Sequence, residues 1–264
     1  MILITGSKGF IGRNLIKRLK SQDYEVMGID FIGCSNVFDA IMNAPWDRIK
    51  KVYHLGAETD TTCENIEWLI DLNVRFTLTL FEYALANKVP VHYASSAAVY
   101  GNSKDYSYNP LNQYAMSKLW VDMHVKKLNN NLLRGFRFYN VYGLYENKSL
   151  RSSIVWKFIE QAWNEKEVKV FEGSENIFRD FICIDDALDQ FTRKDLKGGI
   201  YDVGTGTPTN VLEIAVAVCN LTGVGMNVVP FPDHLKDKYQ YYTCSPNVWK
   251  AGYKTVNQWL EENI

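Results

Sequence analysis

The sequence predicts an α/β protein with a doubly wound parallel sheet and a second, smaller α/β domain. Short β-branched runs alternate with longer helical patterns through the first half of the chain, and the connections between them are short. This alternation favours parallel strands whose two faces are covered by helices. The 264 residues, 47% of them apolar, match the size and composition of one large α/β domain with a modest addition.

The first half divides into strands and helices in regular order. An apolar run predicts a buried strand at residues 2–5, and the spacing of Leu15, Ile16 and Leu19 predicts a helix over residues 11–20. The same two patterns predict further strands at 26–30, 51–55, 91–95 and 135–138, and helices at 36–43, 66–87 and 113–130.

The pattern loosens beyond about residue 139. Its expected elements are helices at 152–164 and 210–221, short strands at 168–171, 181–184 and 201–203, an extended run at 228–232, and short helices around Trp249 and Trp259. We therefore expect two domains. The first comprises residues 1–138 and about 180–207, and the second comprises residues 139–179 and about 208–264.

Composition excludes several classes of protein. The 29 basic and 30 acidic residues give a net charge of −1, so no basic excess is available to neutralise a nucleic-acid backbone. No apolar run is long enough for a membrane span, and the N-terminus lacks a signal-peptide pattern. The five scattered cysteines include no C-x-x-C pair, and no two histidines have metal-ligand spacing. We expect a cytoplasmic protein with reduced thiols, no metal site, and no nucleic-acid or membrane partner.

A glycine-rich turn follows the first strand and opens the first helix. Gly6, Gly9 and Gly12 form the pattern G-x-x-G-x-x-G, with Phe10 and Ile11 before the last glycine. Glycines permit a tight turn and let a pyrophosphate approach the backbone N–H groups of a helix N-terminus. The turn predicts a Rossmann-type dinucleotide-binding domain with these five residues at the cofactor. The alternative is a strand–helix turn that is merely tight.

The end of the second strand supplies a carboxylate for the same cofactor. Asp30 stands where an acidic side chain accepts both ribose hydroxyls of an adenosine. The next three residues, 31–33, include no lysine or arginine that would hold a 2′-phosphate. The sequence therefore favours NAD, with NADP as the alternative.

Three polar residues form a candidate acid/base group. Tyr114 and Lys118 make the pattern Y-x-x-x-K, and positions four apart lie on one face of a helix. An ammonium near a phenol favours the phenolate, so we expect the pKa of Tyr114 to fall from about 10 toward neutrality. Ser96 closes the preceding strand and can hydrogen-bond the same substrate oxygen. The group predicts proton transfer at a hydroxyl while hydride leaves the carbon.

The chain resembles the extended short-chain dehydrogenases/reductases that act on nucleotide sugars. Five motifs are typical of that whole superfamily: TGSKGFIG, HLGAE, YASSAAVYG, YAMSK and RFYNVYG. Two narrower ones, FEGSENIFRDF and PFPDHLKDKYQ, are similar to the ADP-glyceromanno-heptose 6-epimerases. The resemblance implies an NAD(P)-dependent epimerase that oxidises a sugar to a keto form and reduces it on the opposite face.

The resemblance also assigns residues to the site. It implies cofactor contacts from the HLGAE motif and the helix after it, at Leu55, Gly56, Ala57 and Asn73. It implies a nucleotide-sugar pocket formed by Ser96, Asn140, Phe171, Glu172, Gly173, Ser174, Arg179 and Tyr239. A second catalytic base is implied shortly after the motif NVYG, where Lys148 stands. From the residues alone, Arg179 suits a diphosphate or an ion pair with Asp180 or another carboxylate, and Lys148 is interpreted as a solvated lysine.

The sequence departs from the family pattern in three places. The region after Asp30 is shortened to about twenty residues, and the pair Asn36-Val37 stands where many relatives contact the adenine. The segment between Gly101 and Tyr114 is also short, and Leu144-Tyr145 replaces the usual Pro-Arg.

Other functions remain open. A 4-epimerase or a one-way reductase needs the same tyrosine and lysine. A 4,6-dehydratase is disfavoured because Ala97-Ala98 stands where those relatives have Asp-Glu. A non-catalytic dinucleotide-binding relative usually lacks Tyr114 or Lys118, and both are present. The apolar helix over 66–87 is expected to be buried on more than one face, which favours a homo-oligomer, a dimer or higher.

Overall fold

The computed structural model describes residues 1–34, 36–146, 152–237, 239–247, 249 and 252–264. The chain forms two compact units. Unit 1 comprises Met1–Val99, Asn112–Arg137 and Phe191–Tyr201, and unit 2 comprises Tyr100–Leu111, Phe138–Gln190 and Asp202–Ile264. No helix among the described residues is long and apolar enough to cross a membrane.

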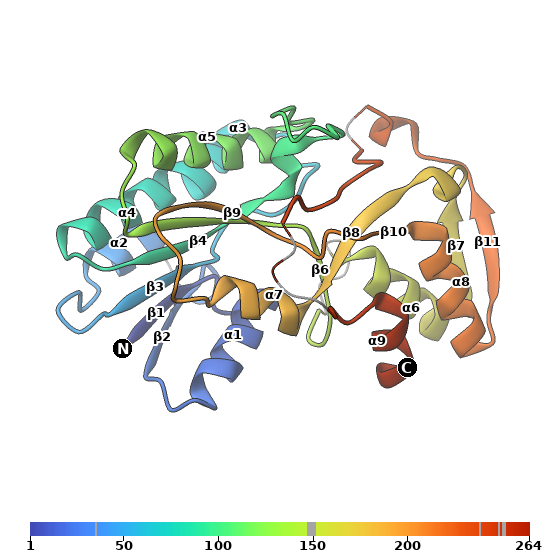
Figure 1. Cartoon of the computed structure of the whole chain (residues 1–264), viewed down its shortest axis with the longest axis horizontal. Helices are drawn as coiled ribbons and strands as arrows, with labels where there is room; N and C mark the ends of the chain where they lie inside the picture. The colour runs from blue at the N-terminus through green and yellow to red at the C-terminus, as the bar shows by residue number, and fades with distance from the viewer. Residues whose placement is uncertain (35, 147–151, 238, 248, 250–251) are drawn as a thin grey trace. The chain divides into compact units, whose positions relative to one another are not determined.

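Unit 1 is built on a six-stranded sheet with the strand order β2-β1-β3-β4-β5-β9 (Figure 1). The strands are β1 (Ile2–Thr5), β2 (Val26–Ile29), β3 (Lys51–His54), β4 (Val91–Ser96), β5 (Leu133–Phe138) and β9 (Gly199–Val203), and the last residues of β5 and β9 lead into unit 2. β1 pairs in parallel with β2 and β3, and β3 pairs in parallel with β4. The predicted α/β class with a parallel central sheet is confirmed.

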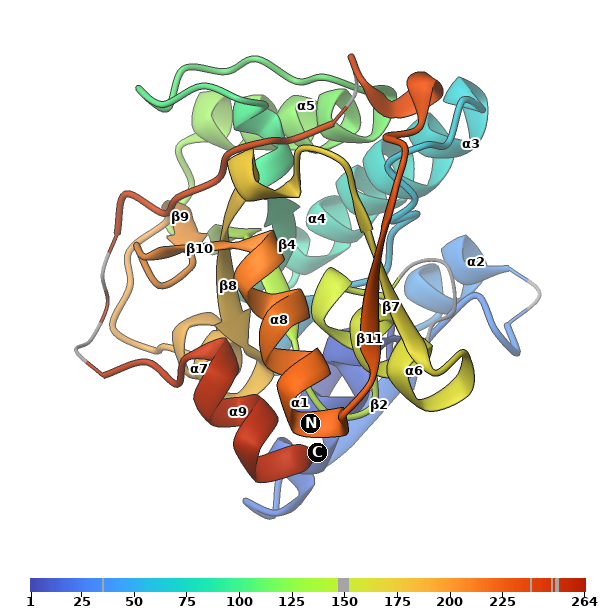
Figure 2. The same ribbon diagram turned by 90° about the vertical axis from the view of Figure 1, so that its right-hand side faces the viewer.

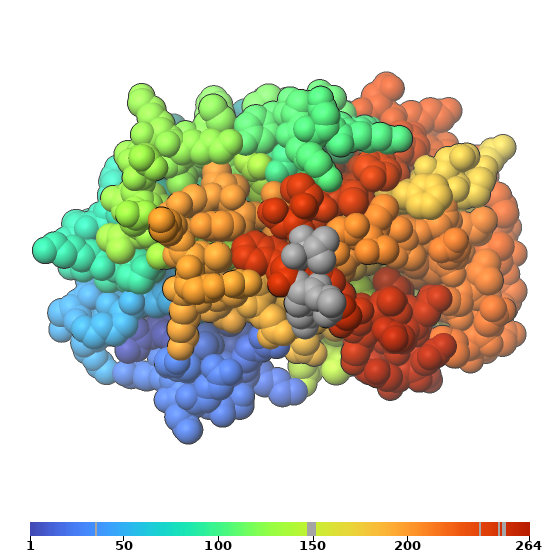
Figure 3. All heavy atoms as spheres, viewed as in Figure 1, coloured from blue at the N-terminus to red at the C-terminus, as the bar shows by residue number. Residues whose placement is uncertain are grey.

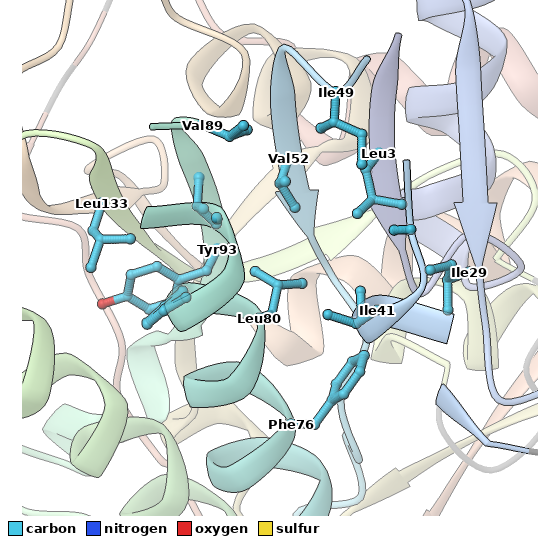
Figure 4. Packing of buried hydrophobic residues seen from close by; sticks show 14 of the residues in the cluster. Leu3, Ile29, Ile41, Ile49, Val52, Phe76, Leu80, Val89, Tyr93 and Leu133 are labelled. Atoms are coloured by element: carbon cyan, nitrogen blue, oxygen red, sulfur yellow. The ribbon is translucent and has the colours of Figure 1, made fainter. Parts of the chain in front are cut away.

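Helices cover both faces of this sheet (Figure 1). The helices of unit 1 are α1 (Phe10–Lys20), α2 (Val37–Met42), α3 (Ile66–Leu69), α4 (Phe76–Ala86) and α5 (Gln113–Leu128). α1 lies on one face, and α2, α4 and α5 lie on the other. Figure 4 shows the core on that second face, where Leu80 and Phe76 of α4 point toward the apolar side chains of β1 and β3.

The predicted helix over 66–87 contains a π-helical segment. α3 and α4 are joined without a break by η1 (Ile70–Arg75), which has π-helical hydrogen bonding. Such segments are rare and are frequently found at functional sites. This one contains the buried Asn73, whose amide binds two other parts of unit 1.

The described part of unit 2 contains two small sheets and several helices. Its strands are β6 (Asn140–Tyr142), β7 (Glu167–Phe171), β8 (Phe178–Cys183), β10 (Pro208–Asn210) and β11 (Gly225–Val229). They form the sheets β10-β8-β6 and β11-β7. The helices are α6 (Ile154–Asn164), α8 (Val211–Thr222), α9 (Val256–Asn263) and all but the last residue of α7 (Ile184–Phe191). Figure 2 shows α8 beside β11 and β7.

The structure differs from the prediction at two points in the second half. The expected strand at 181–184 ends where α7 (Ile184–Phe191) begins, because Asp185 and Asp186 lie in the first helical turn and stabilise a helix N-terminus. The helix predicted around Trp249 was wrong, since Trp249 has no regular structure and its indole N–H instead donates to the Asp202 carbonyl at 2.7 Å. Short single-turn helices among the described residues are η2 (Ala97–Tyr100), η4 (Ser174–Asn176) and η5 (Asp233–Leu235).

Candidate active site

The glycine-rich turn lies at the point where the strand order of unit 1 reverses. The chain passes from β1 to β2 and then returns to β3 on the other side of β1, so Gly6 and Gly56 follow the carboxyl ends of neighbouring strands. Ligands of open α/β sheets bind at such switch points. Gly6 has φ +67°, and a Cβ there would lie 2.6 Å from the Gly56 nitrogen. A Cβ on Gly12 would lie 2.1 Å from the Gly6 oxygen, so only glycine fits at either position.

The N-terminus of α1 is open to a phosphate. Gly9 is its N-cap and offers no side chain to the first N–H groups of the helix. Phe10 is buried beside it, whereas Ile11 is half-buried. Uncapped N–H groups and the helix dipole together favour an anion. The turn therefore fits the pyrophosphate of a dinucleotide.

Asp30 is held by the backbone with part of its capacity unused. Its Oδ2 accepts from the Lys8 N–H at 2.7 Å, and its Oδ1 accepts from the Ile32 N–H at 3.0 Å. An ionised carboxylate has about four acceptor positions. Each oxygen can therefore accept one further hydrogen bond, as the two hydroxyls of a ribose require.

The structure places a cation beside Asp30 that the sequence argument did not include. A Cβ on Gly33 would lie 2.7 Å from Lys8 Nζ, so the ammonium rests against the loop that follows Asp30. The prediction of NAD rested on residues 31–33, which hold no cation, whereas Lys8 reaches the same loop through the fold. Lys8 comes from the glycine-rich turn, 22 positions earlier in the chain.

The two residues expected near the adenine are both used by the fold itself. Asn36 caps α2, and its side chain accepts from the N–H groups of Phe38 and Asp39. Val37 is buried in the core of unit 1. Leu55 and Ala57, on either side of Gly56, are half-buried.

The structure brings Ser96, Tyr114 and Lys118 together in unit 1. α5 begins after Asn112, whose side chain accepts from the Ala115 N–H at 2.9 Å, so Tyr114 lies in the first turn. The Tyr114 hydroxyl hydrogen-bonds Ser96 at the end of β4. Lys118 Nζ lies 5.9 Å from the centroid of the Tyr114 ring and donates to the Ala94 carbonyl at 3.0 Å.

Burial governs the protonation of this group. Burial raises the pKa of Tyr114, and the Ser96 hydrogen bond opposes the rise, while the Glu58 charge adds to it. Burial also lowers the pKa of Lys118 to about 8, against the effect of Asp122. The expected fall in the pKa of Tyr114 was wrong for the protein alone, because the loss of solvation on burial outweighs the opposing effect of the Ser96 hydrogen bond. At neutral pH Tyr114 is therefore a proton donor beside a cation.

Asn73 connects the acid/base group to the cofactor side of the sheet. Its Oδ1 accepts from the Glu58 N–H at 2.8 Å, and its Nδ2 donates to Ser117 Oγ at 2.9 Å. Ser117 precedes Lys118, so Asn73 fixes α5 against the HLGAE segment. The buried hydroxyl of Ser95, next to Ser96, has no hydrogen-bond partner among the described residues. It is a polar atom that a bound group can satisfy.

The four histidines give no metal site. His54 is buried between the hydroxyls of Thr5 and Thr77, at 2.6 and 2.8 Å, and burial lowers its pKa to about 3. His92 Nδ1 bonds the Phe191 carbonyl at 2.7 Å. Both are hydrogen-bonded core residues. Within the described ranges no three His, Cys, Asp or Glu side chains are grouped as metal ligands.

In unit 2, Arg179 and Tyr239 form the centre of a second group. The Arg179 guanidinium carbon lies 4.5 Å from the centroid of the Tyr239 ring, and its Nε and Nη2 both donate to the Gln240 carbonyl. The ring of Phe231 contacts Phe171 and Tyr239, each at 5.2 Å between centroids. Arg179 makes no ion pair with the described residues, so the ion-pair alternative is wrong, and its Nη1 donates no hydrogen bond to those residues.

Asp180 explains why Arg179 has no carboxylate partner. Asp180 is fully buried and accepts four hydrogen bonds, from the N–H and hydroxyl of Thr205 and from the N–H groups of Gly206 and Ser245. The side-chain amide of Asn140 donates to the Asp180 carbonyl at 2.9 Å and to Thr243 Oγ1 at 3.2 Å. Asn140 is therefore tied to the strand that presents Arg179.

The remaining predicted residues follow β7. Glu172 continues the strand with an N–H bond to the Val229 carbonyl, Gly173 has φ +85°, and Ser174 is buried at the start of η4. Lys148 lies outside the described residues. Phe231 and Tyr241 were not predicted from the sequence, although the aromatic-rich tail was a signal for them.

Comparison with known proteins agrees with this geometry. The profile of the NAD dependent epimerase/dehydratase family matches residues 2–204. The chain is 33% identical to an ADP-L-glycero-D-manno-heptose-6-epimerase of Brachyspira hyodysenteriae, over 92% of this chain and 88% of that protein. The crystal structure of the Helicobacter pylori ADP-L-glycero-D-manno-heptose-6-epimerase superposes with a TM-score of 0.78 at 27% identity, covering 99% of this chain and 94% of that one.

A more distant relative shares the fold. The Thermus thermophilus UDP-glucose 4-epimerase, solved in complex with NAD, has a TM-score of 0.80 at 20% identity, covering 98% of this chain and 97% of that one. The family profile includes both the glycine-rich turn and the Ser96, Tyr114 and Lys118 group, and it spans more than half of the chain. The chain belongs to the NAD-dependent epimerase/dehydratase family.

Proposed function

We propose that the protein is an NAD-dependent epimerase of nucleotide-diphosphate sugars, of the ADP-glyceromanno-heptose 6-epimerase type. The observation that carries this proposal is the meeting of Ser96, Tyr114 and Lys118 at one end of a sheet whose switch point has an open, glycine-lined turn. The similarity to two heptose 6-epimerases supports the sugar class.

Unit 1 would hold the cofactor through residues from several turns. They are Gly6, Gly9, Phe10, Ile11, Gly12, Asp30, Asn36, Val37, Leu55, Gly56, Ala57, Asn73, Tyr114 and Lys118. A bound NAD would supply the acceptor and donor of the hydride, and its positive charge would favour the phenolate of Tyr114. Asp30 would orient the adenosine, and Lys8 is available to a 2′-phosphate if NADP binds instead.

The chain's own residues would move the proton. As the phenolate, Tyr114 takes the proton of the sugar hydroxyl, and as the phenol it gives that proton back to the keto oxygen. Ser96 bonds Tyr114 and can orient the same oxygen. Lys118 stabilises the phenolate as an ammonium, which it remains below its pKa of about 8.

Unit 2 would recognise the rest of the substrate. We assign this role to the residues Asn140, Phe171, Glu172, Gly173, Ser174, Arg179 and Tyr239. The free edge of the Arg179 guanidinium suits a diphosphate, and the rings of Phe171 and Tyr239 offer flat surfaces to a base. We also propose that the protein is located in the cytoplasm. Its five cysteines are all free thiols, as is usual in that reducing compartment.

The direct test is incubation with a panel of nucleotide-diphosphate sugars, followed by proton NMR of the products. We expect one ADP-heptose to give a mixture of its two C6 epimers. Conversion of a UDP-hexose at C4 instead would replace the 6-epimerase proposal by a 4-epimerase, and a stoichiometric reduction that consumes NADH would replace it by a reductase.

Substitution of Lys148 distinguishes the 6-epimerase from the 4-epimerase and the reductase. If Lys148 is the second acid/base group, Lys148→Met abolishes epimerisation but keeps cofactor and substrate binding, and one half-reaction through Tyr114 still proceeds on a keto analogue. If Lys148 is a solvated lysine, turnover changes less than about threefold. Single-turnover assays of each half-reaction distinguish the two results.

The cofactor site gives a quantitative prediction. Asp30→Ala should weaken the binding of NAD by roughly 1–3 kcal/mol, because a hydrogen bond to a charged group is lost.

Lys8→Met should weaken the binding of NADP about tenfold and leave the binding of NAD nearly unchanged, since only NADP has the 2′-phosphate. Calorimetric titration of cofactor-free protein measures both, with the exposed Asp47→Ala as the matched control. Equal effects of Lys8→Met on the two cofactors would exclude this role for Lys8.

We also propose that the protein forms a homodimer through α3 and α5. Met116, Trp120 and Met123 lie one helical turn apart on α5 and are 43%, 55% and 49% exposed. Ile66 and Trp68 on the neighbouring α3 are also exposed, so the two helices present one apolar surface.

Trp120→Glu should convert a species of about 60 kDa to one of about 30 kDa in light scattering, because it places a charge at the centre of that surface. Val228→Glu, an exposed apolar position elsewhere, should leave the dimer intact, and a wild-type monomer at micromolar concentration would refute the proposal.

A further inference from the structure

Three cations gather at the amino-terminal edge of the six-stranded sheet in unit 1. Lys51 is the first residue of β3, Arg134 is the second residue of β5, and Lys194 lies in the segment after α7 that belongs to unit 1. β4 separates β3 from β5 in the sheet. The cofactor turn lies at the carboxyl ends of β1 and β3, so the cations mark the opposite end of the strands.

Ring contacts show that Lys51 and Arg134 share one face of the sheet. Side chains two positions apart on a strand point to the same face of the sheet. Lys51 therefore lies on the same face as Tyr53, and Arg134 lies on the same face as Phe136. The ring of His92 on β4 lies 5.4 Å from that of Tyr53 and 4.9 Å from that of Phe136, between centroids. The two cations therefore flank β4 on the same side.

Lys194 approaches this face from the covering segment. The ring of Phe191 packs on Tyr53 at 5.2 Å and on Phe136 at 5.1 Å, which directs the following residues along the sheet edge. Lys194 Nζ lies 3.3 Å from the Tyr24 hydroxyl in the turn before β2. Figure 3 shows this orange segment at the surface beside the blue N-terminal part of the chain.

The neighbouring carboxylates do not neutralise these cations. Glu25 pairs with Arg48 at 2.7 Å, and Asp195 pairs with Arg193. Asp23 is exposed in the turn before Tyr24 and makes no ion pair with the described residues. Lys51, Arg134 and Lys194 likewise have no ion pair within the described part of the chain.

The charges of Arg134 and Lys194 act on the ammonium group of Lys51. Burial first, and then the Arg134 and Lys194 charges, lower the pKa of Lys51 to about 8. Its Nζ lies 4.7 Å from the centroid of the Tyr53 ring. These three cations repel one another, so a bound anion that neutralises their charge would stabilise the folded protein.

We propose that Lys51, Arg134 and Lys194 form a binding site for a phosphate group, either inorganic phosphate or the phosphate of a small metabolite. Arg134 Nε is used by the Leu196 carbonyl at 2.7 Å, which leaves the two terminal nitrogens of the guanidinium for two phosphate oxygens. The two ammonium groups and the Tyr24 hydroxyl are further donors. A ligand here contacts neither the cofactor turn nor the acid/base group, so it would act on the stability of unit 1 or regulate it from the far end of the sheet.

Phosphate binding should be linked to proton uptake. The ionisable groups that face the site are Lys51, Tyr53, His92, Arg134, Lys194 and Tyr24. Burial lowers the pKa of His92 to about 3 and raises that of Tyr53 well above its ordinary value, so neither group changes charge near pH 8.5. Lys51 is the group whose protonation changes there, because a bound dianion returns its pKa toward the ordinary value.

The test is calorimetric titration of inorganic phosphate into NAD-saturated protein at pH 8.5, in two buffers of different ionisation enthalpy and against chloride at equal ionic strength. NAD saturation keeps phosphate out of the cofactor turn. We expect saturable binding at low millimolar concentration with a fraction of a proton taken up. Lys51→Met should weaken it at least about tenfold and remove the proton uptake, whereas Lys50→Met, an exposed neighbour, should change neither.

Three results would overturn the proposal: no saturable phosphate binding to the wild-type protein, equal binding in Lys51→Met, or preference for an acidic peptide over phosphate. The last would assign the surface to a protein partner. Lys194→Met, which alters an exposed side chain and should fold normally, repeats the test if Lys51→Met is unstable. Phosphate affinity there should also fall, and an unchanged affinity would count against the site.

Discussion

Tyr114→Phe is expected to lower turnover at least about a hundredfold while unit 1 keeps its fold and its cofactor. The substitution removes only the hydroxyl that bonds Ser96, and the ring remains packed near Lys118. Without that hydroxyl the sugar proton loses the acceptor that we propose for it. Steady-state turnover and NAD titration on the same preparation measure the two halves of this prediction.

A control distinguishes lost chemistry from lost structure. Tyr83→Phe also removes one phenolic hydroxyl from a half-buried ring, the one stacked on Trp46 in the core of unit 1. It should leave turnover within about threefold of wild type, as expected away from the reacting atoms. Turnover of Tyr114→Phe in that same range would rule out the proposed proton transfer.

Asp180→Ala should destabilise unit 2 by roughly 3–5 kcal/mol, a large part of the stability of an ordinary domain. The carboxylate is fully buried and accepts from three backbone N–H groups and one hydroxyl, and alanine leaves all four donors without an acceptor. A Cβ on Gly204 would lie 2.7 Å from Asp180 Oδ2, so the loop is too closely packed to rearrange around the gap.

Hydrogen exchange read by mass spectrometry measures this effect unit by unit. Peptides around Thr205 and Ser245 should lose protection, while those of the β1–β4 sheet keep theirs. The exposed Asp237→Ala is the matched control and should change stability by less than about 0.5 kcal/mol. Unchanged protection in Asp180→Ala would show that the hydrogen bonds to Asp180 do not hold unit 2 together.

The fold was predictable where periodicity and turn chemistry agree. Residues 2–54 show this, because an apolar run, a glycine turn and a 3.6-residue repeat follow one another and each is enforced locally. The π-helical segment at Ile70–Arg75 was not predictable, since it depends on how the Asn73 amide meets Glu58 and Ser117 across the fold. α7 was missed because its eight residues follow a strand directly and hold too little repeat to stand out.

The site was predictable where one element carries several of its residues. Tyr114 and Lys118 share a helix, so their spacing alone places them on one face. The pKa of Tyr114 was predicted in the wrong direction, because burial is a property of the packed protein and not of the pair. Lys8 was overlooked for the same reason, since only the folded turn brings its ammonium to Gly33.

The central claim is that the sugar is inverted by hydride transfer through a keto form, with Tyr114 handling only the hydroxyl proton. It is tested most directly by running the epimerisation in deuterium oxide and recording proton NMR of both epimers. Because the carbon-bound hydrogen leaves as hydride and returns without meeting solvent, the inverted carbon should keep its protium in substrate and product alike. Deuterium at that carbon would show that the hydrogen leaves as a proton, and it would contradict the account.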